Sequence, residues 1–255
     1  SVLTSIIELQ SVSKSFGGIQ ALYDISFKVE PGAIHAIIGP NGAGKTTLFN
    51  IVTGMYAPDE GEVRFEGRAI QGMAIHDIVR LGIARTFQNV ELFGSMSVLE
   101  NVLVGRHSRM RSGFWGAIGR WRRVTDEESL AVEQARELLR FTGIEELVDQ
   151  KSSDLPFGWQ RFLEIARALA SEPKLLLLDE PASGLNAVET SQLGELLVKI
   201  RDRGVTLLLV EHDMSLTMGV SDHILVLHQG RRLAEGTPRE IQADEAVIGA
   251  YLGRE

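Results

Sequence analysis

The sequence lacks three features that would otherwise narrow its interpretation: cysteine, a long apolar run and an excess of positive charge. Because cysteine is absent, disulfides and thiolate metal sites are excluded, which fits a reducing compartment. No segment approaches the roughly 20 apolar residues of a membrane span, and residues 1–10 lack the basic and apolar regions of a signal peptide. The formal net charge of −8 argues against nucleic-acid binding by the whole chain. We therefore expect a soluble cytoplasmic protein.

Apolar residues, which make up 44% of the 255 positions, follow two different patterns. In the first quarter we expect strands at residues 6–12 and 21–29, and Val63 and Phe65 alternate with charged residues as in a half-buried strand. Three later runs are apolar on both faces, which indicates central strands of a parallel sheet between helices. These runs are residues 175–178, 205–210 and 224–227. The sequence thus predicts antiparallel β structure first and an α/β arrangement after it.

Two capping boxes mark the starts of predicted helices. Thr125 and Glu128 begin a segment whose apolar residues recur near helical spacing until Gly143, a typical helix end. Thr237 and Glu240 form the second box, with a proline at the first helical position. This second box predicts a last helix that reaches about residue 252.

The chain divides into a predicted core and an insertion. No strand-like run occurs between residues 88 and 154, where the helical pattern described above lies. We expect an inserted helical subdomain at residues 88–153. The flanking residues, 1–87 and 154–255, are expected to form an α/β core together with an antiparallel β subdomain.

The strongest motif fits the phosphate-binding pattern Gly-x-x-x-x-Gly-Lys-Thr. It reads Gly39-Pro40-Asn41-Gly42-Ala43-Gly44-Lys45-Thr46-Thr47 and lies between an expected strand at 33–38 and an expected helix at 47–55. Glycines let backbone N–H groups converge on phosphate oxygens, and the helix N-terminus adds partial positive charge. Lys45 is expected to reach the β- and γ-phosphates, and the Thr46 hydroxyl to ligate Mg²⁺. The nucleotide contacts are predicted at Gly39, Asn41, Gly42, Ala43, Gly44, Lys45, Thr46 and Thr47.

A second motif follows the apolar run at 175–178, which ends in the carboxylates Asp179 and Glu180. In a phosphate-loop ATPase, the acid at such a strand end holds Mg²⁺, commonly through water, and a neighbouring acid orients or deprotonates the attacking water. Asp179 suits the first role and Glu180 the second. Alone, the pattern fits equally well a strand end capped by solvated charges. The phosphate loop upstream favours the functional interpretation.

With these motifs in this order, the sequence resembles the ATP-binding subunits of ABC transporters over essentially its full length. The resemblance implies a phosphate-loop (P-loop, RecA-like) ATPase core with an N-terminal antiparallel β subdomain and an inserted α-helical subdomain, using ATP and Mg²⁺. Gln88 matches the glutamine that contacts Mg²⁺ and water, and His212 matches the switch histidine that contacts the γ-phosphate. Phe16 lies where the family has an aromatic residue that stacks on adenine. Lys45, Gln88, Glu180 and His212 are the expected catalytic residues.

The family's signature, Leu-Ser-Gly-Gly-Gln, is altered here to Leu155-Pro156-Phe157-Gly158-Trp159-Gln160. In the family this segment binds the γ-phosphate held by the other ATPase subunit. Pro156 and Gly158 are the signature positions expected to lie at that nucleotide. Because Pro156 offers neither a hydroxyl nor an N–H group, Gly158 and the helix N-terminus remain as the expected donors. Asn186 is a second departure, because the family's dimer-interface loop usually ends in Asp at that position.

The local sequence around these motifs is similar to that of branched-chain amino-acid importers. The similar segments are residues 82–88, 92–93, 96–102, 211–214 and 250–253. That resemblance implies a second ATPase subunit, in a homo- or heterodimer, and two membrane permease subunits. It also implies a periplasmic or extracellular substrate-binding protein, and no nucleic acid as a partner. The expected location is the cytoplasmic face of the cell membrane, with the chain bound there as a peripheral subunit.

Three alternatives remain open. A non-transport ABC ATPase that acts on nucleic acid or ribosomes commonly carries two ATPase halves or a coiled-coil insertion, and neither occurs in these 255 residues. A catalytically weak regulatory module is suggested by Pro156, but Lys45, Asp179, Glu180 and His212 are intact. Another phosphate-loop enzyme, such as a kinase, is disfavoured by the ordered set of family motifs.

One segment is not explained by ATP chemistry. Between Arg106 and Arg123 the chain has six arginines and no acidic residue, together with two of its three tryptophans. A solvated helical insertion with inward apolar residues accounts for this composition. A contact surface for a membrane partner or anionic lipid headgroups is a second explanation. Nucleic-acid binding is a third, and it opposes the overall charge.

Overall fold

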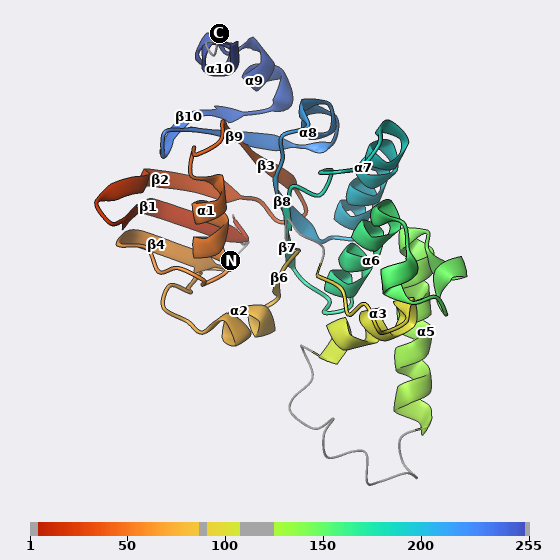
Figure 1. Ribbon diagram of the computed structural model, residues 1–255. Helices are drawn as coiled ribbons and strands as arrows, with labels where there is room; N and C mark the ends of the chain where they lie inside the picture. The colour runs from red at the N-terminus through yellow and green to blue at the C-terminus, as the bar shows by residue number, and fades with distance from the viewer. Residues whose placement is uncertain (1–4, 87–90, 108–124, 253–255) are drawn as a thin grey trace. The chain divides into compact units, whose positions relative to one another are not determined.

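The computed structural model describes residues 5–86, 91–107 and 125–252. The chain forms two compact units, which are Ser1–Arg85 with Lys174–Glu255, and Thr86–Pro173. The first contains both β-sheets, and the second is helical (Figure 1). The predicted fold class, an α/β ATPase core with antiparallel and helical parts, is confirmed.

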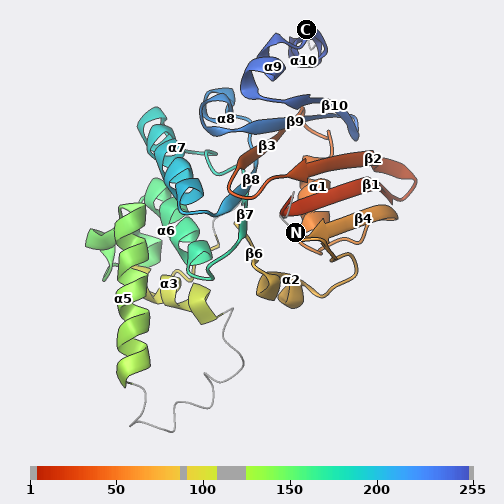
Figure 2. The same ribbon diagram turned by 180° about the vertical axis from the view of Figure 1, so that it is seen from behind.

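The larger sheet of the first unit has six strands, which lie side by side in Figure 2. Their order is β10 (Arg231–Gly236), β9 (His223–His228), β3 (Ile34–Ile38), β8 (Thr206–Val210), β7 (Leu175–Asp179) and β6 (Ile83–Arg85). Neighbouring strands are parallel, except that β10 runs antiparallel to β9. Every residue of β3, β7 and β8 is buried, which explains why these strands are apolar on both faces.

The smaller sheet is antiparallel and has four strands. Their order is β2 (Ile19–Val29), β1 (Ile7–Phe16), β4 (Glu60–Phe65) and β5 (Arg68–Ala69). Val63 and Phe65 are buried on β4, whereas Glu62 and Arg64 are not, as their alternation predicts. The strict order expected from the sequence is not kept, because β3 joins the parallel sheet before β4 and β5 return to the antiparallel one.

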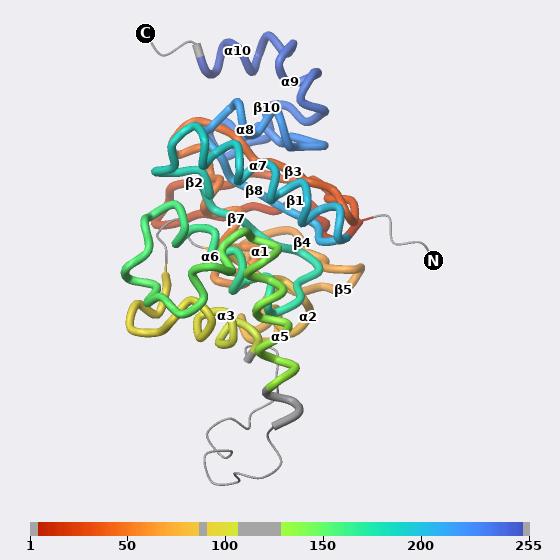
Figure 3. Tube along the Cα trace, turned by 90° about the vertical axis from the view of Figure 1, so that its right-hand side faces the viewer, coloured from red at the N-terminus to blue at the C-terminus, as the bar shows by residue number. Residues whose placement is uncertain are grey.

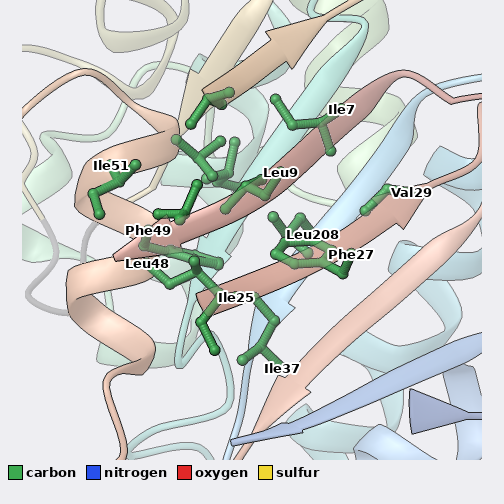
Figure 4. Packing of buried hydrophobic residues seen from close by; sticks show 14 of the residues in the cluster. Ile7, Leu9, Ile25, Phe27, Val29, Ile37, Leu48, Phe49, Ile51 and Leu208 are labelled. Atoms are coloured by element: carbon green, nitrogen blue, oxygen red, sulfur yellow. The ribbon is translucent and has the colours of Figure 1, made fainter. Parts of the chain in front are cut away.

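The two sheets share one hydrophobic core with the helix α1 (Lys45–Val52). Figure 4 shows Leu9 and Ile25 of the antiparallel sheet next to Leu48 and Phe49 of α1, and Leu208 of the parallel sheet belongs to the same cluster. All five side chains are at most 1% exposed. Burying a side chain of this size contributes about 1.5–3 kcal/mol, so the helix that starts at the phosphate loop is firmly held.

The remaining helices of the first unit are α2 (Ile75–Leu81), α7 (Ala187–Asp202), α8 (Met214–Val220), α9 (Pro238–Ala243) and α10 (Glu245–Leu252). The capping box at Thr237 and Glu240 is present and starts α9. The single last helix expected from the sequence is wrong, because the chain leaves the helix at Asp244 and begins a second one (Figure 3). Asp244 accepts hydrogen bonds from the N–H groups of Ala246 and Val247, and thereby caps α10.

The second unit consists of α3 (Val98–His107), α5 (Thr125–Thr142), α6 (Phe157–Leu169) and two 3₁₀ turns, Glu145–Leu147 and Ser152–Asp154. Its described residues contain no strand, only an isolated bridge between Ser97 and Lys151. The helix predicted from Thr125 to Gly143 corresponds to α5. The structure places the end of this unit at Pro173 rather than at 153, because α6 packs against α3 and α5.

Candidate functional site

The glycine-rich run at residues 39–44 forms the turn between β3 and α1. Two of its glycines are required by the chain that packs on them. A Cβ atom at Gly39 would lie 2.2 Å from the carbonyl oxygen of Leu227, and one at Gly44, where φ is +105°, would lie 2.7 Å from a carbonyl oxygen of β2. The Gly230 N–H also donates a 3.0 Å hydrogen bond to the Ala43 carbonyl. The loop is therefore shaped by β2 and by the turn after β9.

Lys45 is the first residue of α1, and only 6% of it is exposed. Its Nζ atom donates hydrogen bonds to the carbonyl oxygens of Gly39 at 2.6 Å and Pro40 at 3.1 Å. Burial lowers the pKa of the Lys45 ammonium, and the nearby charges of Glu180 and Asp179 oppose that shift. The site therefore places a cation beside the loop where the sequence predicts phosphate groups.

The N-terminus of α1 is open to an anion. Gly44 caps it without a side-chain hydrogen bond, and its first turn contains no acidic residue. Asn41, Gly42 and Thr46 are exposed here, and Thr47 is half-buried. Uncapped N–H groups and the positive end of the helix dipole together attract a negatively charged group. The local structure therefore has the features that the phosphate-loop prediction requires.

Asp179 is buried at the end of β7, where its carboxylate is held by a guanidinium. The Arg85 Nη2 atom donates a 2.7 Å hydrogen bond to Asp179 Oδ2, and Nη1 donates one of 2.6 Å to Asn50 Oδ1. Arg85 ends β6, and Asn50 belongs to α1, so one side chain joins two strand ends to the helix that carries Lys45 and Thr46. The sequence patterns assigned no role to Arg85 or Asn50. Arg85 offers one sequence signal, a cation at a strand end, and its meaning depends on the pairing of β6 with β7. Asn50 offers none.

Glu180 and His212 are in direct contact. The Glu180 Oε1 atom lies 2.7 Å from His212 Nε2, so the predicted base and the predicted switch histidine meet between the ends of β7 and β8. Glu180 has a φ of +48°, which is uncommon for a residue with a side chain, and its N–H donates to the Val210 carbonyl at 2.8 Å. A carboxylate in contact with an imidazole can hold or accept a proton at a fixed place.

Phe16 ends β1 and is 41% exposed. The Tyr56 ring meets it edge-on, with the centroids 5.1 Å apart and an interplanar angle of 66°. On the same ring, the Lys14 Nζ atom lies 5.4 Å from the centroid. An exposed aromatic ring supported in this way can stack on a planar base. The structure thus gives Phe16 the exposure that its predicted role needs.

The parallel strands bring the predicted residues to one edge of the sheet. Lys45 follows the end of β3, whereas Asp179, Glu180 and His212 end or follow β7 and β8. In the described part of the chain, no group of three or more acidic or histidine side chains could hold a metal alone. A Thr46 hydroxyl and an Asp179 carboxylate nevertheless suit Mg²⁺, which usually takes one or two protein oxygens together with phosphates and water. Gln88, the third predicted ligand, lies outside the described residues.

Residues 22–183 match the family model described as ABC transporter. The chain belongs to this family. It is therefore the ATPase component of an ABC system, as its motifs predicted. Residues 231–255 also match the model described as branched-chain amino acid ATP-binding cassette transporter.

Several curated proteins are similar to this ABC ATPase over nearly its whole length. The "high-affinity branched-chain amino acid transport ATP-binding protein BraF" of Pseudomonas aeruginosa is 44% identical, with 97% of this chain and 98% of that protein covered. The protein of the same description named LivG in Escherichia coli is 41% identical, with the same shares covered. A probable LivG of Archaeoglobus fulgidus is 40% identical, with 97% and 95% covered.

Solved ABC cassettes have the same fold. The ADP conformation of the cassette MJ1267 is 32% identical and has a TM-score of 0.85, with 98% of this chain and 99% of that chain covered. A nucleotide-free ATP-binding cassette, also 32% identical, has a TM-score of 0.84, with 96% and 98% covered. These likenesses span both units of the chain.

The altered ABC signature lies in the second unit, at the start of α6. Pro156 is the N-cap residue of this helix and makes no side-chain capping bond, and Gly158 is buried in its first turn. The Gln160 Nε2 atom donates to the Leu155 carbonyl at 2.9 Å, which closes the turn before the helix. The predicted contacts of Pro156 and Gly158 stay predictions, and the N-terminus of α6 is left without a side-chain cap.

The second departure from the ABC pattern has a local explanation. Asn186 is the N-cap of α7, and its side chain accepts a 2.9 Å hydrogen bond from the Glu189 N–H. The Glu189 carboxylate in turn accepts a 3.0 Å hydrogen bond from the Asn186 N–H, which completes a capping box. Asn and Asp cap helices about equally well, so the substitution keeps the helix start and removes a charge.

Proposed function

We propose that this chain hydrolyses ATP to drive an importer of branched-chain amino acids, working at the inner face of the membrane with a second ATPase subunit and two permeases. The contact between Glu180 and His212 at the edge that also holds Lys45 and Asp179 carries the catalytic part of this proposal. The relatives named as branched-chain amino acid transport proteins, and the match of residues 231–255, support the substrate class.

The binding step uses the loop and α1. The N–H groups of residues 41–47 and the Lys45 ammonium hold the β- and γ-phosphates, while Phe16 stacks on adenine. Thr46, Asp179 and Gln88 hold Mg²⁺ in this proposal, and Arg85 keeps one Asp179 oxygen fixed. When bound, Mg²⁺ neutralises charge on the phosphate oxygens.

The hydrolytic step uses the contact between β7 and β8. Glu180 orients the attacking water and takes up its proton, and His212 holds the Glu180 carboxylate in place through their 2.7 Å contact. Across a dimer, the N-terminus of α6 with Gly158 would face the γ-phosphate of the partner subunit. Each ATP would then lie between one subunit's phosphate loop and the other subunit's signature.

Transport requires other chains. Within the described residues, no helix is long and apolar enough to cross a membrane. The permeation path is therefore assigned to the permease subunits, with a periplasmic or extracellular binding protein that delivers the amino acid. The basic segment between Arg106 and Arg123 lies almost entirely outside the described residues, and its contact with a permease or with lipid stays a prediction.

Reconstitution tests this function directly. The chain is purified together with the subunits that accompany it, placed in liposomes with ATP inside, and supplied externally with its binding protein and labelled leucine, isoleucine or valine. Uptake that needs internal ATP and stops in the Glu180→Gln variant is expected. ATP-dependent uptake of an unrelated solute, without uptake of these three, would overturn the substrate assignment and leave the ATPase assignment intact.

A further inference from the structure

Glu211 is a buried acid for which neither the sequence motifs nor the proposed mechanism has a use. It directly precedes His212 and is only 2% exposed. Its carboxylate accepts hydrogen bonds from three backbone N–H groups: Ala182 at 2.7 Å, His212 at 2.8 Å and Asp213 at 3.0 Å. A buried carboxylate is costly unless its oxygens are hydrogen-bonded, so these three donors account for its being tolerated.

All three partners are donors, and this favours an acceptor at Glu211. Burial raises the pKa of Glu211, and the bonds from Ala182, Asp213 and His212 oppose that shift, while the charge of Asp213 adds to it. An ionised carboxylate can accept all three bonds, whereas an amide would turn an N–H group toward an N–H donor. The interaction therefore depends on the carboxylate itself and not only on the volume that it fills.

The two carboxylate oxygens bind different loops. Oε1 accepts from Ala182, two residues after Glu180 in the segment that follows β7. Oε2 accepts from His212 and Asp213, in the segment that follows β8. Glu211 thus connects the backbone that carries Glu180 to the backbone that carries His212.

This connection explains how an unusual conformation is maintained nearby. The φ of +48° at Glu180 costs free energy in a residue with a side chain, and such conformations persist where the surroundings determine them. Two hydrogen bonds hold the backbone at Glu180. The Glu180 N–H donates to the Val210 carbonyl, and the Ala182 N–H donates to the Glu211 carboxylate. The two acceptors are the last residue of β8 and the residue after it, so they fix the backbone at Glu180 relative to the backbone at His212.

We propose that Glu211 is a positioning residue, whose carboxylate sets the alignment of Glu180 with His212 by bonding the backbone of both loops. The inference rests on the roles proposed above for Glu180 and His212. It predicts that Glu211 acts on the rate of the hydrolytic step. Nucleotide binding should be unaffected, because the phosphate loop and Lys45 are held by other contacts.

The test is the Glu211→Gln variant in the assembled complex, with Glu195→Gln on the exposed face of α7 as the matched control. Hydrogen bonds to charged groups imply a fall in kcat of about tenfold or more, with KM and Mg-ATP affinity within about twofold of wild type. The control should keep kcat. A spectroscopic measurement accompanies the kinetic test. The Nε2 resonance of His212 in the Glu211→Gln variant should move toward its position in the Glu180→Gln variant.

A kcat within twofold of wild type for folded Glu211→Gln would overturn the proposal, as would an equal loss of nucleotide affinity. If that variant does not fold, Glu211→Asp keeps the charge and shortens its reach, and it should lower kcat with unchanged affinity. Wild-type kcat in Glu211→Asp would again overturn the proposal. If Glu180→Gln itself hydrolyses ATP at the wild-type rate, the proposed catalytic roles fail rather than this inference alone.

Discussion

Arg85 Nη2 and Asp179 Oδ2 are 2.7 Å apart in a buried ion pair. The side chains are 9% and 6% exposed, so water screens this pair weakly. Because Asp179 is the proposed Mg²⁺ ligand, Arg85 restricts which of its oxygens is available to the metal. The same guanidinium contacts Asn50 on α1, so the position of the acid is tied to the helix that carries Thr46.

Replacing Arg85 with Met is therefore expected to raise the Mg²⁺ concentration needed for half-maximal ATP hydrolysis by about tenfold or more, since loss of a group that orients a metal ligand typically costs about 10–100-fold in metal affinity. ATP binding measured with EDTA present should stay near the wild-type value. Calorimetry with and without Mg²⁺ separates the two effects. Arg64→Met, at a half-buried ion pair on β4, serves as the control. An unchanged Mg²⁺ midpoint would contradict the positioning of Asp179 by Arg85.

Glu180→Gln is expected to abolish turnover and retain ATP. The change removes the proposed base and leaves the Lys45 and Asp179 contacts in place. Trapped ATP should favour the closed dimer, which light scattering or size-exclusion chromatography detects. Hydrolysis in a single turnover at the wild-type rate would sink the assignment of Glu180.

Lys45→Ala should weaken nucleotide binding itself. It removes a charge-assisted contact worth about 1.5–3 kcal/mol, which corresponds to roughly tenfold to more than a hundredfold in affinity. Titration calorimetry with Mg-ATP measures the loss. Lys199→Ala, on the last turn of α7, is the control. Equal affinities for the Lys45→Ala variant and the wild type would contradict the phosphate contact.

Pro156→Ser should give equal or higher ATPase activity in the assembled complex. Serine at the N-cap can accept a bond from the first turn of α6, and it restores a hydroxyl and an N–H group facing the proposed γ-phosphate of the partner. A neutral hydrogen bond formed only in the transition state is worth up to roughly tenfold in rate. A fall of tenfold or more, with folding and assembly intact, would show that the proline form is the working signature.

The stability of the chain should fall between about pH 6.5 and pH 4 because of His35. This residue of β3 is buried beside Phe27, and His223 on β9 faces it. Burial lowers the pKa of His35 to about 4, and the charge of His223 adds to that shift. Above the unfolded value of about 6.5, neither state binds the proton and stability is unaffected. Below about pH 6.5, the unfolded chain binds a proton that the native chain does not bind. The free energy of unfolding therefore decreases until the pH reaches the native pKa of His35.

Denaturant unfolding at pH 7 and pH 5 checks this effect in wild type and in His35→Leu. The wild type should lose about 2 kcal/mol more than the variant over this interval, from about 1.4 kcal/mol per unit below pH 6.5. The comparison removes the contributions of other titrating groups, which are common to both proteins. Parallel losses in the two proteins would show that His35 is protonated in the native state.

The sequence predicted the strands that are apolar on both faces, because β3, β7 and β8 are fully buried and tolerate few polar residues. It did not predict β6 and β10. β6 has three residues, and β10 is an edge strand without a fully buried position, so neither forms a recognisable run. The break at Asp244 was missed because the apolar residues of two short consecutive helices follow nearly the same pattern as those of one longer helix.

The candidate site divides in the same way. Lys45, Asp179 and His212 were found because their motifs are local in the sequence. Arg85 and Glu211 were missed because one decisive partner of each is distant: Asp179 lies 94 residues from Arg85, and Ala182 lies 29 residues from Glu211. Such contacts arise only when parallel strands bring separate segments to one edge of a sheet. The spacing of residues along the sequence does not predict these long-range contacts.

The close approach of Gly39 to Leu227, with the hydrogen bond from Gly230 to Ala43, has a consequence for biosynthesis. A nascent chain that has emerged only as far as α7 contains the whole phosphate-binding motif. It lacks the turn after β9 against which the loop is shaped. Long-range contacts of this kind form late, after most of the chain is available. We therefore expect the growing polypeptide to be unable to hold nucleotide until the turn at Gly230 has left the ribosome.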